Sequence, residues 1–294
     1  MAEVVQDTII QGLYTNPVFS QLMRRNLDPQ SVFYGLVNFK WEKELKTHGD
    51  RVTIYQAGNI PVRDYVKGED MTFDSPEGNK IDIVLDQQKY FGFQLEDIDV
   101  KQSSIKALGE KFIDRAQSEI TLVKDTFIST KMWDGLSEDN MLDTAEFNKD
   151  NAYRILSKLM ARLRWTSAVK NNGTGYDGKR PWIVTDPDTF GVILEAPQTT
   201  KATDAGDKTT REGTVARLAG FDIKVSNHGD SAATNRKIIA GTTEAFAFVN
   251  QINKTKVQEA EKRFATNYSG LYLFGGDVAE DKALAGMTVT LPAV

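Results

Sequence analysis

Apolar and polar residues alternate along residues 51–96, and this period of two predicts extended strands. Near its start the alternation puts Val52 and Ile54 on one face. Residues 66–80 interrupt the pattern with two glycines, a proline and many charged residues, which is typical of a turn. Beyond the turn six apolar residues share one parity: Ile81, Ile83, Leu85, Phe91, Phe93 and Leu95. The pattern predicts a long β-hairpin over residues 51–96 with a polar tip.

The period changes farther along the chain, where apolar residues begin to recur at steps of three and four. They are Ile105, Leu108, Phe112, Ala116, Ile120, Val123 and Phe127. This spacing predicts an amphipathic helix of about seven turns with a charged opposite face. Glu110, Arg115 and Lys124 belong to that charged face. Because the helix has a single apolar stripe, we expect it to lie across a sheet.

The remainder of the chain combines shorter helices and strands with a first segment that has no clean period. Residues 1–46 contain scattered apolar positions and indicate an extended arm with short helical turns. Two further helices are predicted over residues 151–165 and 187–195. Strands are predicted over residues 181–185, 221–226, 237–241, 270–274 and 287–291. The class is mixed, and we expect an α+β fold.

Composition narrows the function classes. The net charge is −5, so any contact with nucleic acid is expected to be local and weak. The chain has no cysteine and two histidines, which excludes disulfides, thiolate metal sites and a cysteine nucleophile. No stretch approaches the ~20 apolar residues that a membrane-spanning helix requires. We therefore expect no membrane segment and no cofactor.

Three acidic residues offer the one cluster with possible chemistry. Glu96, Asp97 and Asp99 follow the last predicted hairpin residues, and paired carboxylates can act as acid and base or bind a hard cation. The simpler interpretation is a solvated junction, since carboxylates also favour the start of a helix. Neighbouring Phe91 and Phe93 could stack on bases, but their parity places them on a buried face. No catalytic or metal site is predicted.

A second consideration is physical rather than chemical. A two-stranded hairpin is at best marginally stable alone in water, and both of its strands are open edges. The arm over residues 1–46 has the same lack of its own core. Neighbouring subunits could cover both elements, which would make the protein an obligate assembly. Periodicity alone leaves equally open a hairpin that folds back onto its own domain.

The order of the elements resembles that of a known family. An arm, a long hairpin, a long helix, a mixed domain and returning strands occur in this order in the major capsid proteins of tailed bacteriophages. Local segments are also similar to that family: residues 49–54 (GDRVTI), 62–70 (VRDYVKGED), 89–99 (KYFGFQLEDID), 218–227 (LAGFDIKVSN) and 239–245 (IAGTTEA). The resemblance implies the Hong Kong ninety-seven-type capsid fold, which encapsulin shell proteins share.

This resemblance implies a division of the chain into five segments. They are an N-terminal arm (1–47), an extended loop formed by the β-hairpin (48–96), a peripheral domain with the long spine helix (97–149), an axial domain (150–254) and a return to the peripheral domain (255–294). The extended loop would reach over a neighbouring subunit, and contacts between subunits would involve Arg63, Asp64, Tyr65, Lys67, Glu69, Asp70, Glu110 and Arg115.

The resemblance also implies a function. The chain would not be an enzyme but a structural subunit that forms pentamers and hexamers of an icosahedral shell around phage DNA. Its partners would be other copies of itself, a scaffolding protein and a portal, with weak non-specific contact to packaged double-stranded DNA. The protein would be found in the virion and would assemble in the host cytoplasm. The alternatives are an encapsulin-like nanocompartment shell and a soluble hydrolase that uses Glu96, Asp97 or Asp99.

Overall fold

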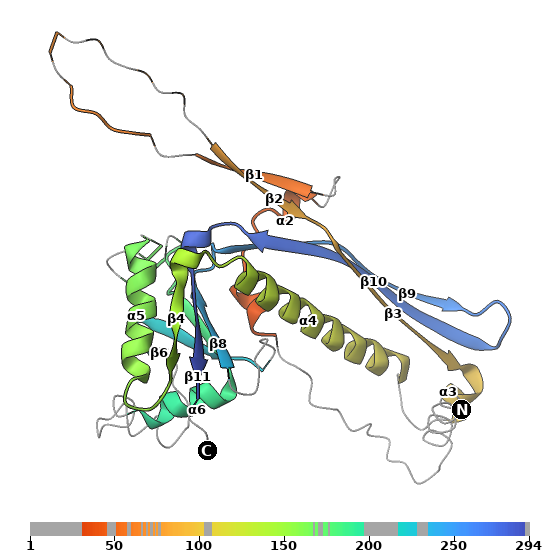
Figure 1. Cartoon of the computed structure of the whole chain (residues 1–294). Coiled ribbons are helices and arrows are strands. Elements are labelled where there is room, and N and C mark those ends of the chain that lie inside the picture. The colour runs from red at the N-terminus through yellow and green to blue at the C-terminus, as the bar shows by residue number, and fades with distance from the viewer. Residues whose placement is uncertain are drawn as a thin grey trace.

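The computed structural model describes most of the chain beyond the first 30 residues. The described residues are 31–45, 51–57, 60–65, 67–68, 70, 73, 75, 78–102, 108–166, 168–169, 173–175, 177–196, 217–227 and 235–291. Figure 1 shows a mixed α+β domain at one end, a long helix α4 leading away from it beneath a sheet, and a hairpin that projects from the top. None of the described helices is long and apolar enough to cross a membrane.

A six-stranded mixed sheet forms the centre of the compact domain. Its order is β4-β11-β8-β5-β7-β6. The strands are β4 (Met141–Glu146), β5 (Trp182–Thr185), β6 (Arg217–Leu218), β7 (Phe221–Val225), β8 (Asn235–Gly241) and β11 (Leu284–Thr290). Pairs β4/β11 and β5/β7 are parallel, and the other pairs are antiparallel. This sheet therefore takes strands from three of the five segments expected from the sequence.

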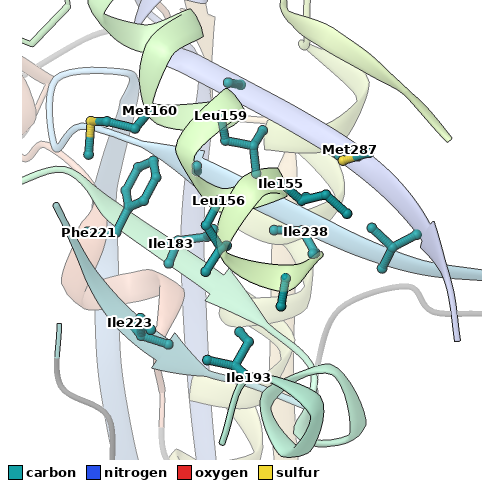
Figure 2. Close-up of a cluster of buried hydrophobic side chains, with 14 of the residues drawn as sticks. Ile155, Leu156, Leu159, Met160, Ile183, Ile193, Phe221, Ile223, Ile238 and Met287 are labelled. Atoms are coloured by element: carbon teal, nitrogen blue, oxygen red, sulfur yellow. The ribbon is translucent and has the colours of Figure 1, made fainter. Parts of the chain in front are cut away.

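Two helices cover one face of this sheet, α5 (Ala152–Trp165) and α6 (Pro187–Glu195). Figure 2 shows the core between them, where Leu156 and Leu159 of α5 lie close to Ile183 and Ile238 of the sheet. These four side chains are fully buried. Both helices agree with the predicted ranges because an apolar stripe packed against a flat sheet leaves a clear period in the sequence.

The opposite face of the six-stranded sheet packs against the end of α4 (Leu108–Asp134) and against the 3-10 turn η1 (Phe33–Leu36). Side chains of β5 alternate between the two faces of the sheet. Ile183 packs in the core under α5 and α6, whereas Trp182 and Val184 pack on the opposite face in the core formed with α4 and η1. The short turns η2 (Glu138–Asn140) and η3 (Asp281–Ala283) lie near β11 (Leu284–Thr290), whereas the short helix α2 (Glu42–Leu45) contacts the strands β9 (Phe246–Glu259) and β1 (Arg51–Ala57).

A separate three-stranded antiparallel sheet extends away from the compact domain. It has the order β3-β10-β9, with β3 (Gln87–Glu96), β10 (Ala265–Val278) and β9 (Phe246–Glu259). Helix α4 covers one of its faces. There Phe93 of β3 stacks on Tyr268 of β10 with 5.0 Å between ring centroids and meets Phe112 of α4 at 5.7 Å. The prediction that the long helix packs across a sheet is confirmed.

The observed hairpin is shorter than predicted, because residues 78–96 form two strands that pair with different partners. Strand β1 (Arg51–Ala57) pairs only with β2 (Gly78–Val84), and β3 pairs instead with β10 along its whole length. Phe91 and Phe93 lie on the face that packs toward α4, so pairing β3 with β10 leaves both side chains partly buried there. The parity of the apolar residues was predicted correctly, but the strand partner was not.

The long helix also differs from its prediction. It ends at Asp134, and its buried apolar side chains Ile120, Ile128 and Met132 are separated by eight and by four residues, so they share one face of the helix. Val123 is 38% exposed although it belongs to the predicted stripe, whereas Lys124, placed on the charged face, is buried. Packing by η1 as well as by both sheets widens the buried face beyond a single stripe. Helix α3 (Asp97–Gln102) and strand β4 were not predicted.

The first test concerns the burial of α4. Replacing Ile128 with Ala removes a fully buried side chain, so we expect the free energy of unfolding to fall by about 3 kcal/mol. The matched control is Val123→Ala on the same helix, which should change it by less than about 0.5 kcal/mol. Urea denaturation measures both. Equal losses in the two variants would show that the helix is oriented differently.

Candidate assembly surfaces

The hairpin of β1 and β2 is anchored at one end and exposed at the other. At its root Ile83 and Leu85 are buried against Ala247 and Val249, the latter two in β9. Between the two strands the described residues from 60 to 75, here called the loop 60–75, are all exposed. Figure 1 shows this loop extending far from both sheets.

Several large apolar side chains stand on this loop without a core. Val62 is 98% exposed and Phe73 is 89% exposed, and Ile60 and Tyr65 are each 72% exposed. Isolated exposed apolar residues are ordinary on a protein surface, but a group of them on one projection marks an interaction site. The loop is therefore suited to contact another molecule rather than its own domain.

The residues expected at subunit contacts fall into two separate places. Arg63, Asp64, Tyr65, Lys67 and Asp70 are exposed on the loop 60–75, and Glu69 lies outside the described residues. The other two predicted contact residues, Glu110 and Arg115, are not near the loop, because both belong to α4.

The second place is the first half of α4, at the opposite end of the subunit from the loop (Figure 1). The backbone of Glu110 is in this helix, but its side chain is outside the described residues. Arg115 forms an ion pair with Glu119 one turn later, and both side chains are partly exposed. Contacts through the loop and through α4 would therefore involve different faces of the subunit.

The root of the predicted arm is held by one buried carboxylate. Asp125 of α4 is fully buried and accepts three hydrogen bonds, from the Ser31 hydroxyl at 2.7 Å, the Val32 amide at 3.0 Å and the Tyr34 amide at 2.9 Å. Two of these donors are backbone amides at the start of η1, which have no partner within the turn. Asp125 thus holds the root of the arm, residues 31–34, against α4.

Lys124 lies beside Asp125 and is buried among aromatic rings. Its ammonium group is 5.7 Å from the ring centroid of Tyr34, 5.3 Å from that of Tyr272 and 5.5 Å from that of Phe274. Burial lowers the pKa of Lys124 below its ordinary value, and the negative charge of Glu42 partly opposes that shift. The cation–π contacts join η1, α4 and β10 in one place.

The three acidic residues of the predicted cluster are divided between the end of a strand and the start of a helix. Glu96 ends β3, and Asp97 and Asp99 lie in the first turn of α3. The Thr266 hydroxyl donates to Asp97 at 3.4 Å. Among the residues that the structure describes, no group of three His, Asp or Glu side chains could hold a metal ion. These positions suit carboxylates at the start of a helix.

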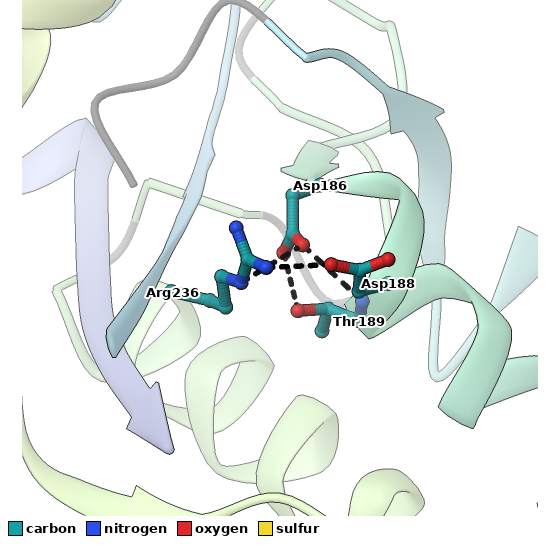
Figure 3. Close-up of polar contacts among 4 residues, drawn as sticks. All are labelled: Asp186, Asp188, Thr189 and Arg236. Carbon is teal, nitrogen blue, oxygen red and sulfur yellow. Dashed lines mark hydrogen bonds and ion pairs between the residues drawn. The ribbon is translucent and has the colours of Figure 1, made fainter. Parts of the chain in front are cut away.

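A polar cluster that the sequence did not indicate joins α6 to β8. Figure 3 shows Asp186 accepting hydrogen bonds from the Thr189 amide and hydroxyl, while Arg236 of β8 contacts Asp186 at 3.5 Å and Asp188 at 2.6 Å. The dipeptide Asp186-Pro187 could have indicated the start of a helix, since Asp caps helices and Pro favours the first helical position. No sequence signal indicated that Arg236, on a distant strand, would contact Asp186. The cluster braces the start of α6 against β8.

Comparison with known proteins gives a fold but no sequence family. No protein-family model matches the sequence, and no curated protein matches it. Among solved structures, a chain from Mycobacterium phage Che8 superposes with a TM-score of 0.73 at 21% identity, covering 92% of this chain and 96% of that chain. A chain of the capsid of cyanophage P-SCSP1u gives 0.72 at 13% identity, with 95% and 93% covered.

A third similar structure is the mature capsid of bacteriophage PhiM1, with a TM-score of 0.70 at 13% identity and coverage of 95% of this chain and 92% of that chain. The similarity in each case extends over nearly the whole length of both chains. The protein therefore has the capsid fold of tailed bacteriophages, and the expected α+β class and fold are confirmed.

The second test concerns the arm root. Replacing Asp125 with Ala leaves the amides of Val32 and Tyr34 without their acceptor, so we expect a loss of about 3 kcal/mol in the free energy of unfolding. Asp114→Ala, an exposed carboxylate on the same helix, should change stability by less than about 0.5 kcal/mol. Denaturation in urea distinguishes them. An Asp125→Ala protein as stable as the control would rule out this anchor.

Proposed function

We propose that this chain is a major capsid subunit, which assembles with copies of itself into an icosahedral shell around phage DNA. The loop 60–75 is the observation that carries the proposal, because its exposed apolar side chains lie far from any core of their own subunit. The capsid fold shared with the similar structures supports the same function. No catalytic role is proposed for Glu96, Asp97 or Asp99.

The loop 60–75 and α4 lie on different faces, and this arrangement supports the proposed assembly. A surface that binds a different surface on the next copy generates rings, and rings of five and six close into a shell. We propose that the loop 60–75 contacts a neighbouring copy through Arg63, Asp64, Tyr65, Lys67, Glu69 and Asp70. Glu110 and Arg115 of α4 would contribute a second contact.

The six-stranded sheet with α5 and α6 would form the axial part of the subunit. The three-stranded sheet with α4 would form the peripheral part. A scaffolding protein and a portal are the partners that such a shell would need during assembly in the host cytoplasm. The net charge of −5 suits an inner wall that makes only weak contact with double-stranded DNA in the virion.

The function is tested by electron microscopy of the purified protein, together with size-exclusion chromatography. We expect closed shells or capsomer rings, because the exposed loop requires a partner. Shell diameter and contents then separate a virus capsid from an enzyme-filled nanocompartment. A uniform monomer that never assembles, even with a scaffolding protein added, would contradict the proposal.

A loop variant tests the proposed contact. Replacing Val62, Tyr65 and Phe73 together with Ser should leave the unfolding midpoint unchanged, since these side chains are exposed. The yield of shells should drop by about tenfold or more, because losing about 1.4 kcal/mol of contact weakens association tenfold. Val225→Ser, which alters an exposed apolar residue in β7, is the control and should assemble normally. Normal assembly of the triple variant would remove the loop from the interface.

A further inference from the structure

An open pocket lies on α4, between η1 and β10, and its floor contains the buried Lys124. The pocket has a volume of about 240 Å³, far more than one water molecule fills. Its lining residues are Tyr34, Gln117, Ile120, Thr121, Lys124 and Tyr272. Four of them belong to successive turns of one face of α4, so a continuous helix wall supports the pocket.

The charge of this pocket is unbalanced. Among the described residues that line it, Lys124 is the only charged one, and none carries a carboxylate. Lys124 as a whole is only 8% exposed, and the described residues place no carboxylate in ion-pair contact with it. Glu42 acts on it from a distance, and its effect is smaller than that of burial. A buried cation without a paired anion is costly, so the pocket favours an incoming negative charge.

The three aromatic rings do not replace such a counter-ion. Tyr34, Tyr272 and Phe274 surround Lys124 at 5.3 to 5.7 Å and stabilise the cation through their faces. Cation–π contacts of this kind leave the N–H donors of the ammonium group available for an oxygen acceptor. An ammonium group has three donors and no acceptor, and oxyanions are its ordinary partners.

Two tyrosine side chains also line the pocket. The Tyr34 hydroxyl accepts a hydrogen bond from the Asn250 amide at 3.1 Å, which leaves its own proton free to donate. Burial raises the pKa of Tyr272, so its hydroxyl stays protonated at neutral pH. The nearby Thr255 hydroxyl opposes that shift, yet the Tyr272 hydroxyl is buried and completes no hydrogen bond of normal geometry.

We propose that this pocket binds a single oxyanion group, a carboxylate or a phosphate, through the Lys124 ammonium group with help from the Tyr34 hydroxyl. The group has two possible sources that share this chemistry. It is either a free anion from solution or an acidic side chain of a neighbouring copy of this chain. The second source rests on the proposed assembly, whereas the first does not.

The decisive experiment uses inorganic phosphate as the probe and the unassembled subunit as the protein. Thermal unfolding is followed as phosphate replaces chloride at constant ionic strength. We expect the unfolding temperature of the wild-type subunit to rise with phosphate, since a ligand that binds only the folded state stabilises it. Lys124→Met keeps the apolar stem and should lose this rise, with at least about tenfold weaker binding by calorimetry, which corresponds to about 1.4 kcal/mol.

Two control variants make the result specific. Lys111→Met removes a lysine from the same helix but outside the pocket, and it should retain the full phosphate effect. Tyr34→Phe keeps the ring over Lys124 and loses only the hydroxyl, so binding should weaken by a few-fold, as expected for one hydrogen bond. An identical phosphate response in wild type and Lys124→Met would overturn the proposal, because phosphate would then act non-specifically.

A pH series adds a second readout. Phosphate binding requires the protonated ammonium, so it should be lost as pH rises through the pKa of Lys124. Because burial lowers that pKa below 10.5, the loss should occur at a lower pH than for an exposed lysine. The groups that face Lys124 are Glu42, Tyr34 and Tyr272. Binding that persists unchanged above pH 10.5 would contradict a role for the ammonium group.

The assembled protein identifies the source of the anion. If a neighbouring carboxylate occupies the pocket, shells bind no phosphate and Lys124→Met assembles more slowly than Lys111→Met. If the anion is free, shells bind phosphate at one site per subunit and both variants assemble alike. A subunit that never forms shells leaves the phosphate result standing. The failure of one proposal is thus distinguishable from the failure of the other.

Discussion

The burial of the second half of α4 is the constraint on which the rest of the structure depends. Ile128 and Met132 are fully buried there, between the six-stranded sheet, the three-stranded sheet and η1. One helix therefore acts as a shared wall for elements that come from distant parts of the chain. Asp125 and Lys124 extend this role, because the first fixes the arm root through hydrogen bonds and the second gathers rings from η1 and β10.

Local periodicity was enough to predict the elements whose burial is simple. Helices α5 and α6 match their predicted ranges because each has one face against a sheet. The parity of β3 was correct because one face of that strand packs toward α4. The partner of β3 could not be predicted. Glu96 pairs with Ala265, which is far away in the sequence, and nothing local distinguishes that partner from β1. Lys124 was assigned to solvent because a lysine in a charged run normally lies there.

The candidate assembly surface was only partly accessible from the sequence. Turn chemistry located only part of the exposed loop, since the predicted turn over residues 66–80 omits residues 60–65 and includes the start of β2. The family resemblance supplied the role expected for the loop. Residues such as Arg63 and Asp70 then followed from their place on the loop rather than from any motif of their own. The two buried anchors on α4 gave no such signal. Both anchors act through contacts with segments that are distant in the sequence. Ser31 and Asp125, for example, are 94 residues apart.

The position of β11 has a consequence for biosynthesis. This strand, Leu284–Thr290, lies between β4 and β8, so it is an interior member of a sheet whose other strands are made earlier. A ribosome must therefore have translated the chain through Thr290 before β4 can pair with its neighbour. Such long-range closure is slow compared with the formation of local helices. Chains that end before β11 leave edges of β4 and β8 unpaired, and such edges make incomplete chains prone to aggregation.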